Sequence, residues 1–434
     1  MGQPLPPPAP ETVLNRGRLW NRDFFLLWQG QTVSQLGSQA FQIAMMSWLL
    51  RATGSASLMG LLMFTALLPG VVLAPVGGTF ADRHSRIRIA LICDLLCGAA
   101  VLALSFAMFD PRVERLEPAA VRFVISLMFG VSALLGILRA FFTPALTAAI
   151  PDLVPREKIT AANSLNQISV QGSSLLGQAI GGVLFQALGA AFLYLINGLS
   201  FLFAALCAIL IRLPPRASVP RPSAARPFRQ FLRETADGFR YLWKQTGLRD
   251  FALIASVVNF LGMPIMVLFP FFVELYLKKD ARWYGFLLAA IGAGSVAGFV
   301  LAGAKPLKGD ERRRWIATAM ILAPLIFGIL GFVSNAWAAL GVAFLGGAAL
   351  GVINVYLLSM VQMATPSEVR GRVLSVMMTL TGGLMPIGMV LGGVVGDLTG
   401  KNVPLIYAVC GGLALLAASG VFVRRDLREF LAHG

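Results

Sequence analysis

Long apolar segments alternate with short polar joints along almost the whole chain. Each segment has roughly 20 residues or more, enough for a helix to cross about 30 Å of hydrocarbon. The segments are 24–50, 58–81, 89–109, 121–150, 160–187, 189–211, 250–277, 283–304, 315–334, 337–362, 373–398 and 403–423. The pattern predicts twelve membrane-spanning segments in two sets of six.

These segments are expected to be helices. Backbone groups in lipid must pair within their own segment or within a closed barrel, and the alternating ten-residue pattern of a barrel is absent. With 57% hydrophobic residues and a mean hydropathy of +0.76, the chain is too apolar for a soluble enzyme. The sequence therefore predicts an all-α integral membrane fold of twelve transmembrane helices in two pseudo-symmetric six-helix bundles.

A polar interruption divides the chain into two halves. We expect a disordered cytoplasmic tail at 1–22, an N-terminal bundle at 23–211, a cytoplasmic linker at 212–248, a C-terminal bundle at 249–424 and a cytoplasmic tail at 425–434. Apolar residues of the linker share one helical face, typical of a helix lying on the membrane surface: Phe228, Phe231, Leu232, Phe239, Leu242 and Trp243. The alternative is a flexible tether with chance periodicity.

The net charge of +16 could indicate a nucleic-acid partner. With both termini cytoplasmic, however, most of the 36 Lys and Arg residues fall on cytoplasmic segments, as the positive-inside rule requires. The charge therefore indicates orientation in a membrane, which we expect to be a bacterial inner membrane, and no nucleic-acid partner is expected. The lipid bilayer is the expected surroundings of a monomer.

The two halves repeat one another. Residues 155–189, PREKITAANSLNQISVQGSSLLGQAIGGVLFQALG, align without a gap with residues 366–400, PSEVRGRVLSVMMTLTGGLMPIGMVLGGVVGDLTG. The matched glycines favour close helix packing: Gly177 with Gly388, Gly181 with Gly392 and Gly182 with Gly393. A weaker echo pairs Gly60 and Gly78 with Gly285 and Gly303. Parallel duplication of six helices is a plan of transporters whose substrate site lies between the halves.

The charged joint GGTFADRHSRIRIALICD resembles the signature between the second and third helices of the major facilitator superfamily. The matching residues are Gly78, Asp82, Arg83, Arg86, Arg88 and Asp94, while Ser85 stands where a second glycine is usual. The resemblance extends from 22 to 425, and NRDFFLLWQGQTVSQLGSQAFQ and TPSEVRGRVLS are similar to the branch with macrolide-type and siderophore exporters. It implies secondary active export of a small polar or amphipathic molecule by alternating access.

The six matched residues are predicted to act as a gate. Asp82 at a helix end can pair with arginines or with a helix N-terminus of the other half, which would close the cytoplasmic side. The alternative is that these charges only set orientation. That alternative explains the arginines but leaves the two aspartates without a role.

A second motif bears on the driving force. GQAIGG, residues 177–182, resembles the Gly-Pro-x-x-Gly-Gly signature of drug/proton antiporters, with Gln178 where proline is usual. The resemblance implies protons as the coupling ion. Because the same glycines recur in the second half, helix packing is the alternative reading.

Amide side chains mark a candidate substrate site. Gln is costly in an isolated apolar helix, yet four lie broadly along one face of the first segment. We expect a small-molecule substrate to contact that face, together with Arg139 and polar residues of other segments. The candidates are Gln31, Gln35, Gln39, Gln42, Arg139, Asn163, Gln167, Asn259, Asn354 and Tyr356. Interhelical hydrogen bonding is the alternative role for each amide.

Arg139 lies about eleven residues before the end of its segment, which places it roughly 16 Å deep in the membrane. A charge at that depth is functional by default, and a structural pair is the alternative. Arg139 also resembles a family arginine associated with proton coupling, so Arg139, Glu274 and Asp94 are the proton-coupling candidates. A central arginine without a central acid favours neutral, zwitterionic or anionic cargo.

Other classes of protein fit less well. No nucleophile, metal or phosphate-loop motif appears, so we expect no enzyme activity, no metal and no cofactor. Within carriers, the alternatives to export are uptake and lipid or lysophospholipid flipping. A non-transporting membrane receptor or scaffold is the alternative of another class.

Overall fold

The computed structural model describes residues 19–211, 227–304, 309–365 and 370–423. The first part contains α1 (Arg22–Thr53), α2 (Ala56–Arg83), α3 (Arg86–Met108), the short α4 (Pro111–Glu114), α5 (Pro118–Leu153), a 3-10 turn (Arg156–Lys158) and α6 (Ile159–Leu210). The linker contributes α7 (Pro227–Lys244). The described ranges contain no strand, and the all-α membrane fold is confirmed.

The second half repeats this plan with more interruptions. It contains α8 (Thr246–Val267), α9 (Phe269–Phe271), a π-helix (Phe272–Tyr276), α10 (Ala281–Ala304), α11 (Gly309–Leu330), α12 (Ala336–Ala364), α13 (Arg370–Gly383), α14 (Met385–Leu398) and α15 (Val403–Val423). Two helices of this half are broken, at Leu268 between α8 and α9 and at Leu384 between α13 and α14. Pro270 and Pro386 follow these breaks. Proline lacks an N–H and clashes with the preceding turn, so each break has a local cause.

Ten described helices or helix pairs are long and apolar enough to cross a membrane. The sequence predicts twelve spans, and the difference has two sources. The 52-residue α6 is taken as one span although Gly189, with φ of 78°, bends it where the sequence predicts two helices. The glutamines of α1 lower its hydropathy below that of the other spans.

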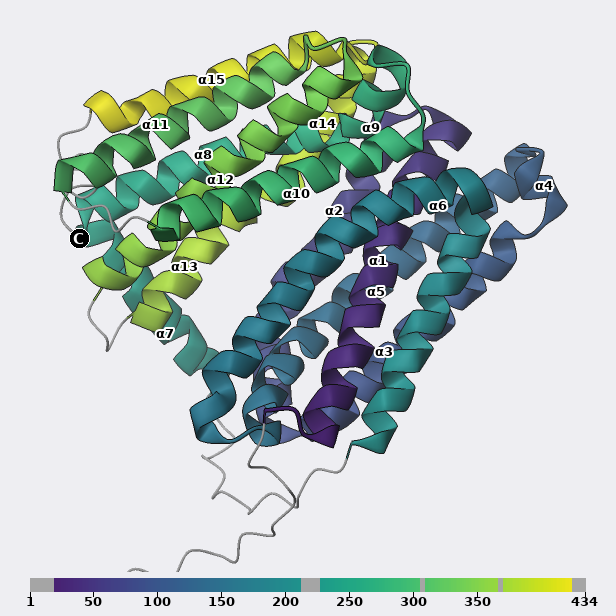
Figure 1. The fold of residues 1–434 in the computed structure, drawn as a ribbon, viewed down its shortest axis with the longest axis horizontal. Coiled ribbons are helices and arrows are strands. Elements are labelled where there is room, and N and C mark those ends of the chain that lie inside the picture. Colours follow the sequence, from purple (N-terminus) through teal and green to yellow (C-terminus); the bar gives the residue numbers. More distant parts are fainter. Residues whose placement is uncertain (1–18, 212–226, 305–308, 366–369, 424–434) are drawn as a thin grey trace, which may run out of the picture.

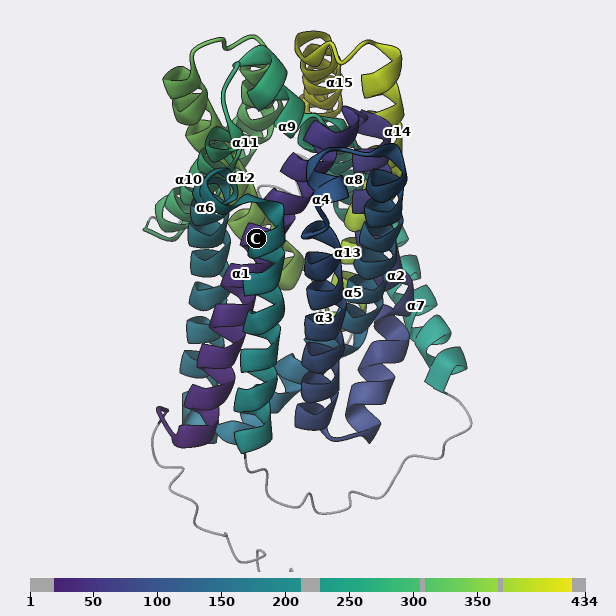
Figure 2. The ribbon, with the colours of Figure 1, turned by 90° about the vertical axis from the view of Figure 1, so that its right-hand side faces the viewer.

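The helices form two bundles that meet at one end and diverge at the other. Helices α1–α6 make one bundle and α8–α15 the second, and the ribbons separate toward α7 (Figure 1, Figure 2). Most described contacts between bundles join α2 to α14 and α6 to α10. We call the end with Ala56 and Ala281 the contact end, and the end with the α2–α3 joint the splayed end.

Apolar packing seals the contact end. One core cluster runs through both bundles there and includes Met59 of α2, Leu287 of α10 and Phe269 of α9, each fully buried. Close van der Waals packing of such side chains helps to hold the two bundles together at this end.

Within the expected linker, α7 packs on the second bundle through Leu242, which is fully buried with Val373 and Phe251. Phe239 and Trp243 are exposed and stacked, with ring centroids 5.0 Å apart. The side chains of 227–235 lie outside the described part of the chain. That α7 rests on a membrane surface therefore stays a prediction.

Candidate functional site

Two glutamines of α1 make contacts inside the first bundle. Gln31 is buried, and its Nε2 donates to Oδ2 of the buried Asp94 on α3 at 3.4 Å. Gln39 accepts a hydrogen bond of 3.2 Å from Nε2 of Gln178 on α6. In this conformation both amides act between helices.

The other two glutamines of this face keep free hydrogen-bonding capacity. The Oε1 atom of Gln35 is buried and has no hydrogen-bond partner, and Gln42 is exposed. An unpartnered buried amide oxygen is costly, so it favours a water molecule or a polar ligand beside Gln35.

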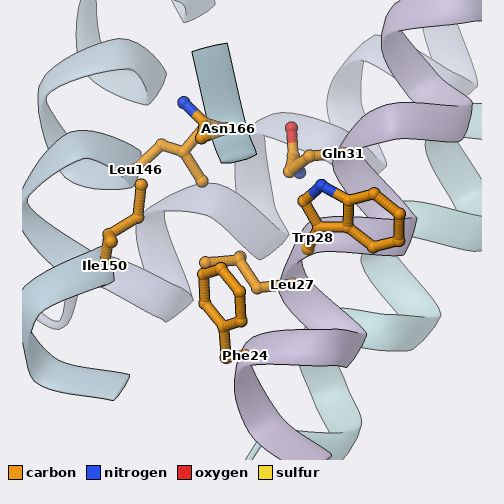
Figure 3. Close-up of a pocket in the computed structure, with 7 residues that line it drawn as sticks. All are labelled: Phe24, Leu27, Trp28, Gln31, Leu146, Ile150 and Asn166. Carbon is orange, nitrogen blue, oxygen red and sulfur yellow. The ribbon is translucent and has the colours of Figure 1, made fainter. Parts of the chain in front are cut away.

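A small recess opens beside Gln31, between α1, α5 and α6 (Figure 3). Its walls are mostly apolar, and Trp28 is held in place by donating to Oγ of Ser169 at 2.6 Å. The lining residues are Phe24, Leu27, Trp28, Gln31, Leu146, Ile150 and Asn166. Gln31 therefore separates Asp94 from the recess.

Arg139 lies level with the middle of the polar face of α1. Ser132 of α5 donates to Met45 of α1 at 3.7 Å, and Leu146 faces Gln31 across the recess. The two helices are antiparallel, so Arg139, midway between Ser132 and Leu146, is level with Ser38. The spacing of seven residues from Leu146 puts Arg139 on the same face of α5.

The Arg139 side chain is exposed on that face. It makes no hydrogen bond or ion pair with the described residues. The structural pair that was the alternative role for this arginine is therefore not seen among them. An unpaired guanidinium in a membrane helix, beside amide groups, can bind a carboxylate, phosphate or carbonyl oxygen.

Two predicted site residues of α6 lie on the same helical face as the backbone of Gln178, which meets the second bundle. Asn163 and Gln167 are exposed, and Gln167 lies eleven residues, about three turns, before Gln178. A Cβ atom at Gly285 of α10 would lie well under 3.0 Å from the carbonyl oxygen of Gln178, so this face meets α10 at the contact end. Nearer the splayed end the same face of α6 is left open.

The second bundle contributes fewer free polar groups. Asn259 donates to the backbone carbonyl of Thr381 at 3.0 Å. The hydroxyl of the buried Tyr356 donates to the backbone carbonyl of Ala302 at 3.4 Å. Asn354 is exposed. Among the predicted site residues that the structure describes, those with free polar groups therefore lie mainly on the first bundle.

The charged α2–α3 joint pairs within its own bundle. Arg86 donates to Asp152 at 2.9 Å and also to the carbonyl of Ala148, both on α5. Arg83 and Arg88 are exposed. Asp82 lies in α2, but its side chain is outside what the structure describes. A Cβ at Gly78 would meet nothing within 4 Å.

The repeated glycines divide into two groups by what they touch. Gly177 and Gly181 approach α1, while Gly388 and Gly392 approach α8, all within their own bundle. Gly182 and Gly393 instead face the other bundle, against Ala281 and Ala56 respectively. Close approach between helices requires small residues at such points.

Gly60 and Gly285, matched in the weaker repeat of the sequence, also face the other bundle. A Cβ at Gly60 would lie well under 3.0 Å from the carbonyl of Met389, as one at Gly285 would from that of Gln178. In the repeat alignment, Gln178 matches Met389 and Gly182 matches Gly393. The bundles therefore meet along two equivalent seams, α2–α14 and α10–α6. In each seam, a helix of the weaker repeat (α2 or α10) packs against a helix of the stronger repeat (α14 or α6).

Charged groups at the contact end also join the bundles. Nε of Arg51, at the end of α1, lies 3.6 Å from Oε1 of Glu274. Arg51 also donates to Oε1 of Gln186 at 3.1 Å. Glu274, a proton-coupling candidate, is thus an ion-pair partner across the halves in this conformation.

The architecture is shared with solved membrane transporters. A bacterial homologue of the iron transporter ferroportin in the inward-facing state superposes with a TM-score of 0.70 at 16% identity, over 94% of this chain and 100% of that one. The nucleoside transporter NupG superposes with a TM-score of 0.69 at 12% identity, over 93% and 99%. Such likeness shows the fold alone: a multi-pass, all-α membrane fold of two helical bundles.

Sequence comparison narrows the class. A family model described as "Transmembrane secretion effector" matches residues 18–433, and the chain belongs to this family of major facilitator transporters. It is 28% identical over 395 residues to macrolide efflux protein A of Streptococcus pyogenes, covering 88% of this chain and 91% of that protein. It is 27% identical over 403 residues to the multidrug efflux pump Tap of Mycolicibacterium fortuitum, with the same shares. The resemblance to the macrolide-type branch is confirmed, and the chain is a transporter rather than an enzyme.

Proposed function

We propose that this protein exports small polar or amphipathic organic molecules, such as a siderophore, a secondary metabolite or a drug, by alternating access. The names of its relatives support the direction, and the two bundles that meet at one end support the mechanism. The splayed end faces the cytoplasm of a bacterial inner membrane in this proposal, with both termini on that side. Cargo then enters between the bundles from inside.

The exposed, unpaired Arg139 beside the polar face of α1 is the observation that carries the proposal. It supplies one positive charge at bilayer depth, where a charge interacts more strongly than in water. Gln35 and Gln42 lie about one turn to either side of Ser38, which is level with Arg139, and offer further hydrogen bonds. Neutral, zwitterionic or anionic cargo fits this set best.

Comparison of metabolites tests this function directly. A strain that lacks the gene should retain a polar or amphipathic compound that the wild-type strain releases, and the chain in proteoliposomes should then exchange that compound. Accumulation inside wild-type cells would instead support the uptake alternative, and movement of labelled lysophospholipid between leaflets the flippase alternative. A chain that catalyses no counterflow of any compound would be a receptor or scaffold.

We further propose proton coupling, with Asp94 as the proton carrier among the three candidates. Asp94 is 2% exposed and makes no ion pair with the described residues, whereas Glu274 is paired with Arg51. The titratable groups that interact with Asp94 are the buried thiols Cys93, Cys97 and Cys207. Gln31 lies between Asp94 and the recess, and we propose that the proton passes at this point.

Asp94→Asn is expected to abolish concentrative transport driven by a proton gradient while leaving substrate counterflow within about twofold of wild type. Asparagine resembles the protonated carboxyl and keeps an acceptor for Gln31, so packing is maintained. Both activities are measured in proteoliposomes, with and without an imposed pH difference.

Glu274→Gln is the matched carboxyl-to-amide control, and gradient-driven transport should survive it. Loss of driven transport in Glu274→Gln but not in Asp94→Asn would transfer the role to Glu274. Equal loss of counterflow and driven transport in Asp94→Asn would show that Asp94 only supports the fold.

The α2–α3 joint keeps its proposed role as a gate of the splayed end. Arg86 and Asp94 both pair within the first bundle in this conformation. The proposed gate, with Asp82 at its centre, engages only when the splayed end closes.

A further inference from the structure

The two seams of the contact end are equivalent in backbone but differ in their polar contacts: an Arg51–Glu274 ion pair lies near the α10–α6 seam, and a carboxylate contacts a helix N-terminus at the α2–α14 seam. Asp397, at the end of α14, accepts hydrogen bonds from the backbone N–H groups of Ala56 at 3.0 Å and Ser57 at 2.8 Å. It also accepts one from the Ser55 hydroxyl at 3.0 Å. The carboxylate of one bundle thus covers the N-terminus of a 28-residue helix of the other.

The N-terminus of α2 is not capped by its own residues alone. The Ser55 hydroxyl accepts from the N–H of Leu58 at 3.2 Å, which leaves the N–H groups of Ala56 and Ser57 to Asp397. The first N–H groups of a helix have no partner within it, and the helix dipole places partial positive charge there. A carboxylate is therefore the group that this position stabilises best.

The other seam lacks such a contact. In the alignment of 155–189 with 366–400, Gln186 holds the position of Asp397. In the weaker repeat that pairs Gly60 with Gly285, Asp280 holds the position of Ser55. Gln186 is exposed and accepts from Arg51, while Asp280 caps its own helix through the N–H of Arg282 at 3.1 Å. The Arg282 guanidinium, hydrogen-bonded to Asp280, holds the pKa of that carboxyl below its usual range. The N–H groups of Arg282 and Trp283 at the start of α10 therefore have partners within their own bundle.

We infer that Asp397 stabilises the closed contact end through the α2–α14 seam and so shifts the balance between the two transport conformations. The inference rests on the proposed alternating access, because the bundles must part here when the splayed end closes. Parting strips two backbone N–H groups of their partner on the α2–α14 side only.

Removal of the contact is expected to shift the balance measurably. Loss of a helix cap together with its charge–dipole attraction changes a two-state ratio by about tenfold. In Asp397→Ala the fraction of molecules with a separated contact end should rise by this factor. Asp397→Asn should lie between, because its amide oxygen accepts a hydrogen bond but its NH₂ group cannot.

Distances between two spin labels report the fraction directly. Arg115→Cys and Ser334→Cys place exposed labels on contact-end loops of the two bundles, while the native cysteines are all buried. The doubly labelled full chain in lipid nanodiscs is compared as wild type, Asp397→Ala, Asp397→Asn and Gln186→Ala. Gln186→Ala is the matched control at the equivalent position, and it should leave the distances unchanged.

The outcomes distinguish the proposed role of Asp397 from the proposed transport function. Longer distances in Asp397→Ala and unchanged ones in Gln186→Ala support the inference, whether or not a cargo has been found. Distances in Asp397→Ala that equal those of wild type would overturn it and leave the proposed export intact. If Asp397→Ala is not monodisperse, the comparison of Asp397→Asn with Gln186→Ala gives the same decision.

Discussion

Arg139→Ala is expected to lower export of anionic and zwitterionic cargo by at least about tenfold and to affect cationic compounds much less. A charge-assisted hydrogen bond to a carboxylate or phosphate contributes about 1.5–3 kcal/mol, which corresponds to this loss. Arg139→Lys keeps the charge but not the planar pair of donors, so it should recover part of the activity. Export is measured in cells and in inside-out vesicles with compounds matched in size and differing in charge.

Arg122→Ala is the matched control for this experiment. Arg122 lies on the same helix, is exposed, and donates to the carbonyl of Pro118 one turn earlier. Its loss should leave export of every compound within about twofold of wild type, as for a surface position. Equal losses of anionic and cationic cargo in Arg139→Ala would contradict the charge argument, and an unchanged anion export would remove Arg139 from the site.

Gly60→Ala and Gly285→Ala are each expected to reduce transport by about tenfold or more and to separate the contact end. The added Cβ would meet a backbone carbonyl oxygen of the opposite bundle well under 3.0 Å away, and a carbonyl inside a helix cannot turn aside. Overpacking of this kind costs about 1–3 kcal/mol, which the molecule can relieve by parting its bundles. Counterflow and the contact-end label distances measure the two effects.

Gly303→Ala provides the control, because Gly303 lies on α10 with Gly285 and a Cβ there would meet nothing within 4 Å. Alanine also has the higher helix propensity, so this variant should be folded and active. If Gly285→Ala transports as well as Gly303→Ala, the α10–α6 seam is not a tight contact in the working protein.

Much of the fold could be predicted from the sequence. Hydrophobic length alone locates most of the spans, because a helix must match the hydrocarbon thickness. The bend at Gly189 falls between two predicted segments, where glycine adopts a φ of 78° without strain. The break between Val267 and the π-helix was not predicted, although Pro264 and Pro270 nearby are a local signal for it.

The candidate site could be predicted only in part. The sequence places Gln31, Gln35, Gln39 and Gln42 on one face, yet it cannot say which of them a neighbouring helix occupies. The answer depends on partners far along the chain, Asp94 for Gln31 and Gln178 for Gln39. Arg139 was predicted from the cost of burying a charge, which needs no knowledge of its neighbours.

The sequence by itself determined the membrane class, the helical fold, the internal duplication and the family resemblance. Each of these follows from local composition or from similarity along the chain. Only the tertiary structure decided that the two repeats meet each other, with Gly60 against the carbonyl of Met389 and Gly285 against that of Gln178. Only the tertiary structure also decided that Asp397 caps a helix of the other bundle. The physical reason is that contacts between bundles depend on which helices pack side by side. Hydrophobic periodicity along the chain does not specify which helices become neighbours.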